Sequence, residues 1–157
     1  MHGRVQPWLP PEFMADLQRA IEIAVIAHQG QRQRNGLPYV LHPLTLMLAM
    51  ETVPAKIVAV LHDVVEDSEW TLAQLEAEGF APDILAALDC LTHQPDEPYE
   101  AYIDRLSENA LARQVKLADL RDNMDIQRLP TLHDRDLERL RRYHQAWLKL
   151  QHLTQNS

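Results

Sequence analysis

The chain has 157 residues, a formal net charge of −8, 46% hydrophobic residues and one cysteine, Cys90. This length and composition are typical of one globular domain, and a single cysteine excludes an intramolecular disulfide. The acidic balance argues against a nucleic-acid partner, and no apolar stretch approaches the ~18 residues of a membrane span. We therefore expect a cytoplasmic protein with one domain over residues 1–157, whose core covers about 11–153.

Apolar residues recur at helical spacing along the chain, whereas the period-two alternation of strands is scarce. The first expected helix covers about 11–28, and a polar, glycine-containing loop follows over 29–38. Pro43 and Pro54 can lie in the first turns of the next two helices, because proline is tolerated there. The expected helices after the loop cover about 43–51, 54–67, 72–78, 82–91, 98–106, 110–124 and 134–153. The sequence therefore predicts an all-α fold in a single compact helical domain.

The middle of the chain is strongly acidic. Residues 57–104 contain twelve aspartates and glutamates and not one lysine or arginine. Such a segment needs cations to offset its charge, and metal ions are one candidate. A solvated acidic surface is the alternative, and we prefer it for Glu76, Glu78, Asp96 and Glu97.

The densest group of candidate ligands is the run His62-Asp63-Val64-Val65-Glu66-Asp67, on the helix expected from Pro54. Residues three and four apart share a helix face, so His62 should lie near Glu66 and Asp63 near Asp67. Three carboxylates without a neighbouring cation destabilise a helix unless something positive is bound. Imidazole beside carboxylate is a ligand set suited to Mn, Fe, Zn or Co. The run therefore predicts a metal site, although an adjacent His-Asp pair alone is common.

Two further residues have two interpretations each, and a third has one. His28 ends the apolar stripe of the first helix and is either a ligand or a core histidine hydrogen-bonded at the helix end. Asp119 lies among small and apolar neighbours and is either a ligand or an exposed acid. We interpret His42, before Pro43, as a structural turn or cap residue.

The order of a histidine, a His-Asp pair and a distant aspartate resembles the HD superfamily of metal-dependent phosphohydrolases. Within it, the chain resembles the alarmone hydrolases, which are small stand-alone enzymes and the hydrolase half of RelA/SpoT-type proteins. Three motifs carry this resemblance, in family order over about residues 20–128: Ala27-His28-Gln29-Gly30-Gln31 with Gly36-Leu37-Pro38-Tyr39 and His42-Pro43; Leu61-His62-Asp63-Val64-Val65-Glu66-Asp67; and Lys116-Leu117-Ala118-Asp119 with Asn123.

The resemblance implies one divalent ion, usually manganese in this family. The four implied ligands are His28, His62, Asp63 and Asp119. It also implies that Glu66 and Asp67 handle the attacking water and its protons. A divalent ion makes a nucleophile at neutral pH by lowering the pKa of its bound water, and a nearby carboxylate can serve as general base.

The resemblance further implies a nucleotide substrate. Asn123 would contact its sugar, and the loop over 31–36, with Arg32 and Arg34, would hold base and phosphates. Guanidinium groups suit both tasks, although solubility of an exposed loop also explains the two arginines. The implied reaction is hydrolysis of guanosine tetra- or pentaphosphate at the 3′ position, releasing pyrophosphate and GDP or GTP.

Three positions depart from the family, because Gln33, Leu120 and Asp125 stand where many alarmone hydrolases have arginine. The metal ligands survive these changes, but the expected cationic lining of the pocket becomes thinner. Two alternatives therefore stay open. One is an HD phosphohydrolase acting on another nucleotide or phosphoester, and the other is a non-enzymatic regulator that only binds nucleotide.

Overall fold

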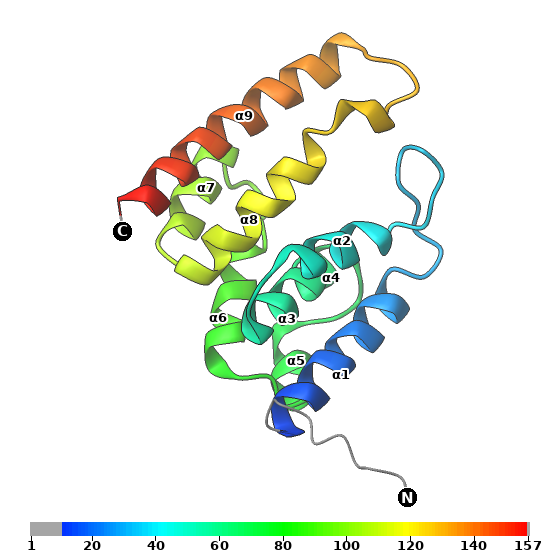
Figure 1. Ribbon diagram of the computed structural model, residues 1–157, viewed down its shortest axis with the longest axis vertical. Helices are drawn as coiled ribbons and strands as arrows, with labels where there is room; N and C mark the ends of the chain where they lie inside the picture. The colour runs from blue at the N-terminus through cyan, green and yellow to red at the C-terminus, as the bar shows by residue number, and fades with distance from the viewer. Residues whose placement is uncertain (1–10, 157) are drawn as a thin grey trace, which may run out of the picture.

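The computed structural model describes residues 11–156, and this part of the chain is built from helices (Figure 1). In chain order the elements are α1 (Pro11–Ala27), α2 (Leu41–Ala49), α3 (Val53–Leu61), α4 (Val64–Asp67), α5 (Leu72–Ala77), α6 (Pro82–Leu91), α7 (Tyr99–Ser107), α8 (Ala110–Asn123), the 3₁₀ turn η1 (Ile126–Arg128) and α9 (Asp134–Gln155). The predicted all-α fold is confirmed. None of the described helices combines the length and apolarity needed to cross a lipid bilayer.

Local sequence signals determine where several helices begin. Thr52 accepts a hydrogen bond from the backbone N–H of Ala55, and a proline occupies the first turn of α3. Asn109 accepts a hydrogen bond from the backbone N–H of Ala112 at the start of α8. A polar side chain before the helix satisfies a backbone N–H that has no partner within the helix, which is why these starts were predictable.

One expected helix differs from the structure. The segment expected to be continuous over 54–67 is divided into α3 and α4, and the turn between them holds His62 and Asp63. Asp63 has φ −103° and ψ −2°, away from regular helical values. The interruption places the His-Asp pair at a helix end, where its two side chains no longer follow regular helical spacing.

Helix α3 lies at the centre of the larger hydrophobic cluster. Every side chain over residues 57–61 is fully buried, and α3 contacts α1, α2, α6 and α8. Burying a side chain such as Ile57 or Leu61 contributes about 1.5–3 kcal/mol, so this helix is a rigid support for the His-Asp turn at its end.

The described residues form two hydrophobic clusters that meet along α8. The larger cluster is formed mainly by α1–α6, and the smaller one by α7, α8 and α9, which form the upper layer of Figure 1. Helix α8 contributes Ala112 and Val115 to the first cluster and Leu120 to the second. Asp119 therefore lies on α8 where the two clusters adjoin.

Candidate metal centre

Three elements that are distant in sequence bring together His42, His62 and Asp119. His42 lies in the first turn of α2, His62 follows α3, and Asp119 lies in α8. All three are buried, and their ligand atoms lie within 4.8 Å of one another. Asp119 Oδ1 is 3.0 Å from His42 Nε2 and 3.6 Å from His62 Nε2. Two imidazoles converging on a buried carboxylate are a set that can hold a divalent metal ion.

The His62 ring shows what this cluster requires. Its Nδ1 lies 2.7 Å from the Ala59 carbonyl oxygen, which only accepts, so Nδ1 carries a hydrogen. Its Nε2 is buried and has no hydrogen-bond partner among the described residues, although Asp63 Oδ2 lies 2.9 Å away. A neutral ring would turn its Nε2 lone pair toward the carboxylates of Asp63 and Asp119. A positive charge, from a proton or a metal ion, is needed between them.

The pKa of His62 expresses the same requirement. Burial lowers this pKa, but the Asp63 and Asp119 carboxylates outweigh burial and raise it well above its ordinary value. The negative charge of these two carboxylates favours a proton on His62, and the same charge favours a divalent ion. A nitrogen that binds a metal carries no proton, so the ion would take the place of the proton.

His42 is oriented from its other side. Its Nδ1 lies 2.6 Å from Asp122 Oδ2, and an ionised carboxylate only accepts, so Nδ1 carries a hydrogen. Arg128 holds that carboxylate in turn, with Nη1 3.1 Å from Asp122 Oδ2. This chain of contacts leaves His42 Nε2 facing Asp119.

His28 lies outside the group formed by His42, His62 and Asp119. Its Nδ1 is 2.8 Å from Gln31 Oε1, and its ring packs against Tyr39 with centroids 5.0 Å apart. Its Nε2 is buried and has no hydrogen-bond partner in the described part of the chain. The Tyr39 ring also contacts His42, and its hydroxyl donates to Asp63 Oδ2. The structure thus brings His62, Asp63 and Asp119 together with His42, and Tyr39 contacts both His28 and this group.

The signal for His42 was present in the sequence. His28 and His42 belong to the same motif, and the proline after His42 marks the first turn of a helix rather than a free turn. What the local pattern omits is the approach of α8, whose Asp119 and Asp122 contact the two ring nitrogens.

Asp63, Glu66 and Asp67 form an adjoining group, with carboxylate oxygens within 4.8 Å of one another. Burial raises the pKa of both Glu66 and Asp67 from the ordinary values. Glu66 Oε1 accepts a hydrogen bond of 2.6 Å from the backbone N–H of His93. The expected neighbourhood of Asp63 and Asp67 is present, and the turn at His62 brings Glu66 into the same group.

The predicted substrate residues line a hollow of about 280 Å³ that reaches His42. Asn123 lines it and donates to Asp119 Oδ1 at 2.8 Å. Arg32 and Arg34 also line it, but Arg34 Nη1 is paired with Asp136 Oδ1 at 2.6 Å. Sequence reasoning missed two further lining cations, Arg128 after α8 and Arg139 on α9, because both lie outside the motifs.

The structural comparison identifies the fold. A solved structure of a metazoan ortholog of SpoT superimposes with a TM-score of 0.71, covering 92% of this chain and 88% of that one at 22% identity. In sequence, the chain is 29% identical over 129 residues to the guanosine-3′,5′-bis(diphosphate) 3′-pyrophosphohydrolase of Aquifex aeolicus, covering 73% of this chain and 18% of that protein. The chain is an HD-type, RelA/SpoT hydrolase-like domain.

Two further relatives place the RelA/SpoT-like domain in the same group. It is 30% identical over 131 residues to the GTP pyrophosphokinase of Streptomyces coelicolor, covering 75% of this chain and 15% of that protein. It is 35% identical over 79 residues to the bifunctional (p)ppGpp synthase/hydrolase SpoT of Escherichia coli, covering 46% of this chain and 11% of that protein. The domain spans less than a fifth of the length of these relatives. No model of a known protein family matches it.

Proposed function

We propose that the domain is a metal-dependent phosphohydrolase that removes the 3′-diphosphate of guanosine tetra- or pentaphosphate, releasing pyrophosphate and GDP or GTP. The observation that carries the proposal is the buried, unpartnered Nε2 of His62, which faces the carboxylates of Asp63 and Asp119. The relatives named as 3′-pyrophosphohydrolases support the choice of substrate.

The proposed ligands are the four that the motifs imply, His28, His62, Asp63 and Asp119; the Nε2 of His28, like that of His62, is buried and has no hydrogen-bond partner in the described part of the chain. His42 is a further candidate, because its Nε2 lies 3.0 Å from Asp119 Oδ1 and 3.9 Å from Asp63 Oδ2. Two imidazoles and two carboxylates make a mixed nitrogen and oxygen set, and we propose manganese as the ion. When bound, such an ion lowers the pKa of a coordinated water and polarises the phosphoryl oxygen under attack.

Glu66 and Asp67 are the proposed proton-handling residues. Their carboxylate oxygens border Asp63, and burial raises the pKa of both, so each accepts a proton more readily than an exposed carboxylate. The hydrogen bond from the His93 backbone orients Glu66. A carboxylate within one hydrogen bond of the attacking water meets the geometric requirement for a general base.

The hollow beside His42 is the proposed nucleotide site. Its guanidinium groups suit phosphates and a purine face, and Asn123 extends from Asp119 toward the same space. Arg128 and Arg139, which pair with Asp122 and Asp136, are two further cations of this lining, where the motif positions Gln33 and Asp125 have none. This lining supports a polyphosphorylated nucleotide over an uncharged ester.

The test is to incubate the purified chain with manganese and a panel of nucleotides, including guanosine tetraphosphate, and to identify the products. We expect pyrophosphate and GDP from guanosine tetraphosphate, and loss of turnover in an Asp63→Asn control. Hydrolysis of another nucleotide alone would reassign the substrate. Tight binding of guanosine tetraphosphate without turnover would favour a nucleotide-binding regulator and contradict the proposal.

A further inference from the structure

A second hollow, of about 250 Å³, reaches the candidate metal centre at His62 and Asp63 rather than at His42. Glu66 lines it on the side of the proton-handling group, and Tyr143 lines both this hollow and the first one. The cluster of His42, His62 and Asp119 is therefore reached from two hollows with different linings. A substrate whose reacting bond lies at the cluster can extend one part into each.

The second hollow contains positive charge that carboxylates neutralise only in part. The guanidinium of Arg142 lies over the rings of Tyr99 and Tyr143, 4.9 and 5.7 Å from their centroids, and among the described residues it has no ion-pair partner. Lys116 Nζ is 2.8 Å from Asp119 Oδ2 and 5.2 Å from the centroid of the Tyr102 ring. An ion held by Asp119 would share that carboxylate with Lys116 and leave more of the ammonium charge for an anion.

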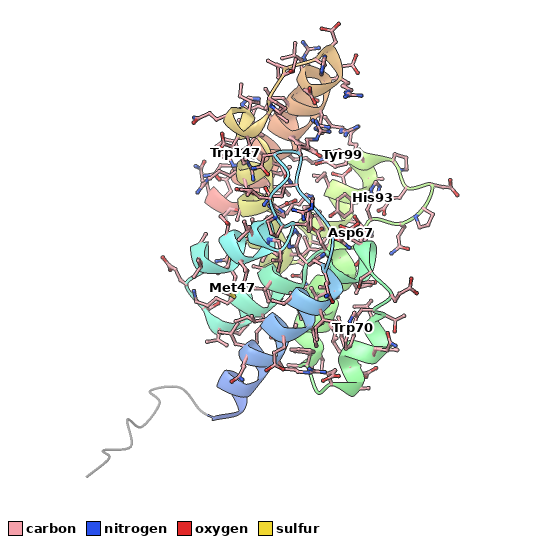
Figure 2. The ribbon with its side chains drawn as sticks, turned by 90° about the vertical axis from the view of Figure 1, so that its right-hand side faces the viewer. Met47, Asp67, Trp70, His93, Tyr99 and Trp147 are labelled. Atoms are coloured by element: carbon pink, nitrogen blue, oxygen red, sulfur yellow. The ribbon has the colours of Figure 1, made fainter. Side chains whose placement is uncertain are left out.

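A buried hydroxyl adds a free donor to these cations. Tyr99 Oη is buried and, within residues 11–156, has no hydrogen-bond partner, whereas Tyr102 Oη donates to the Leu91 carbonyl. Figure 2 shows His93 and Tyr99 close together on the face that also carries Asp67, and the two rings lie 6.4 Å apart. A buried polar atom without a partner is a position where a ligand oxygen gains a hydrogen bond.

We propose that this second hollow binds the diphosphate part of the substrate and the pyrophosphate product, while the first hollow binds the nucleoside and its 5′ phosphates. The inference rests on the proposed function and assigns the two ends of that substrate. Arg142, Lys116 and the Tyr99 hydroxyl donate to diphosphate oxygens, and the acids that line the same hollow, Asp63 and Glu66, lie at its metal end.

The reaction places the product charge in this hollow. The water oxygen forms a new bond to the phosphorus attached to O3′, the bond from that phosphorus to O3′ breaks, and O3′ leaves with the nucleoside and gains a proton. The other water proton passes to a carboxylate of the Glu66 and Asp67 pair. Pyrophosphate thus carries an oxygen that the substrate diphosphate lacked, and the charges of Arg142 and Lys116 stabilise it.

The experiment measures binding of inorganic pyrophosphate and of GDP separately by calorimetry. The protein is saturated with manganese, and syringe and cell hold the same manganese concentration. Arg142→Ala removes the guanidinium, and Tyr99→Phe removes only the hydroxyl. Arg141→Ala is the matched control, because it removes the same charge from the adjacent position, which lines a separate apolar hollow with Met124 and His144.

We expect Arg142→Ala to weaken pyrophosphate binding about tenfold or more, as for the loss of a charge-assisted hydrogen bond, and to leave GDP binding unchanged. Tyr99→Phe should weaken pyrophosphate binding by a smaller factor, and Arg141→Ala should change neither ligand. Unchanged pyrophosphate affinity in both Arg142→Ala and Tyr99→Phe would overturn the inference, as would an equal loss for GDP. If the variants behave as expected but guanosine tetraphosphate is not hydrolysed, the diphosphate site stands and the proposed substrate falls.

Discussion

Removing the carboxylate of Asp122 should weaken metal binding even though Asp122 is not a proposed ligand. Asp122 Oδ2 lies 2.6 Å from His42 Nδ1 and fixes which ring nitrogen is free to face Asp119. Partners of this kind are worth about 10–100-fold in metal affinity, or about 1.4–2.7 kcal/mol. A charge-assisted hydrogen bond contributes about 1.5–3 kcal/mol by an independent route, so the two magnitudes agree. We expect a loss of about tenfold or more for Asp122→Ala.

The assay is the dissociation constant for manganese, from paramagnetic resonance of the free ion. The visible spectrum of bound cobalt is measured on the same variants. Asp125→Asn is the control, because it removes an equal charge from the same chain segment; among the residues that the structure describes, the Asp125 side chain accepts a hydrogen bond only from the Gln127 backbone. Asp122→Asn keeps an acceptor for His42 and should fall between wild type and Asp122→Ala. Manganese affinity in Asp122→Ala equal to that of wild type would refute the orienting role, and so would an equal loss in Asp125→Asn.

Three other predictions follow from the site and its surroundings. His28→Ala should bind much less metal than wild type, as measured by elemental analysis; full retention in His28→Ala with loss in His42→Ala would assign this ligand position to His42. Glu66→Gln and Asp67→Asn should keep their metal, and kcat should fall about 10²-fold for whichever residue is the general base; wild-type kcat in both variants would exclude the pair. Asp136→Asn should lower the free energy of unfolding in urea at pH 7, because the His133 backbone N–H and two arginines hold the pKa of Asp136 down to about 2. That stabilisation is complete above the ordinary pKa of 3.8 and is lost as the pH falls through about 2. The difference in free energy of unfolding between variant and wild type should therefore disappear at low pH.

The helices were predictable because each one is encoded locally. Apolar spacing, the prolines at the starts of α3 and α6, and caps such as Asn109 are all visible in short windows of sequence. The division between α3 and α4 was not predictable in this way. The run from His62 to Asp67 is compatible with one helix, and only the contacts of its side chains with α2 and α8 show where it is interrupted.

Only the site residues that belong to a sequence motif were predictable. His62, Asp63 and Asp119 belong to motifs that resemble a family, whereas the place of His42 depends on contacts with residues 77 and 80 positions away. Arg34 illustrates the same limit. Its loop was expected to present a free cation, but the guanidinium pairs with Asp136, which lies 102 positions away.

The departures from the family pattern also have a structural explanation. Leu120 is fully buried in the smaller hydrophobic cluster, so an arginine at this position would point away from the pocket unless the helix turned. Gln33 accepts a hydrogen bond from Arg128, which lines the pocket itself. The cations expected within the motifs are thus supplied partly by residues beyond α8.

Because α8 lies between the two hydrophobic clusters, metal binding should affect how firmly the two clusters are held together. Of the four proposed ligands, His28 follows α1, His62 and Asp63 follow α3, and Asp119 belongs to α8, the helix packed with α7 and α9. An ion bound by all four would act as a cross-link between the two halves of the molecule, and pulling them apart would require releasing it. At a free ion concentration one hundred times the dissociation constant, this linkage adds about 2.7 kcal/mol to the free energy of unfolding. The melting temperature should therefore rise with the concentration of the ion, and chelation should loosen α7 and α9 from the rest before α3 unfolds.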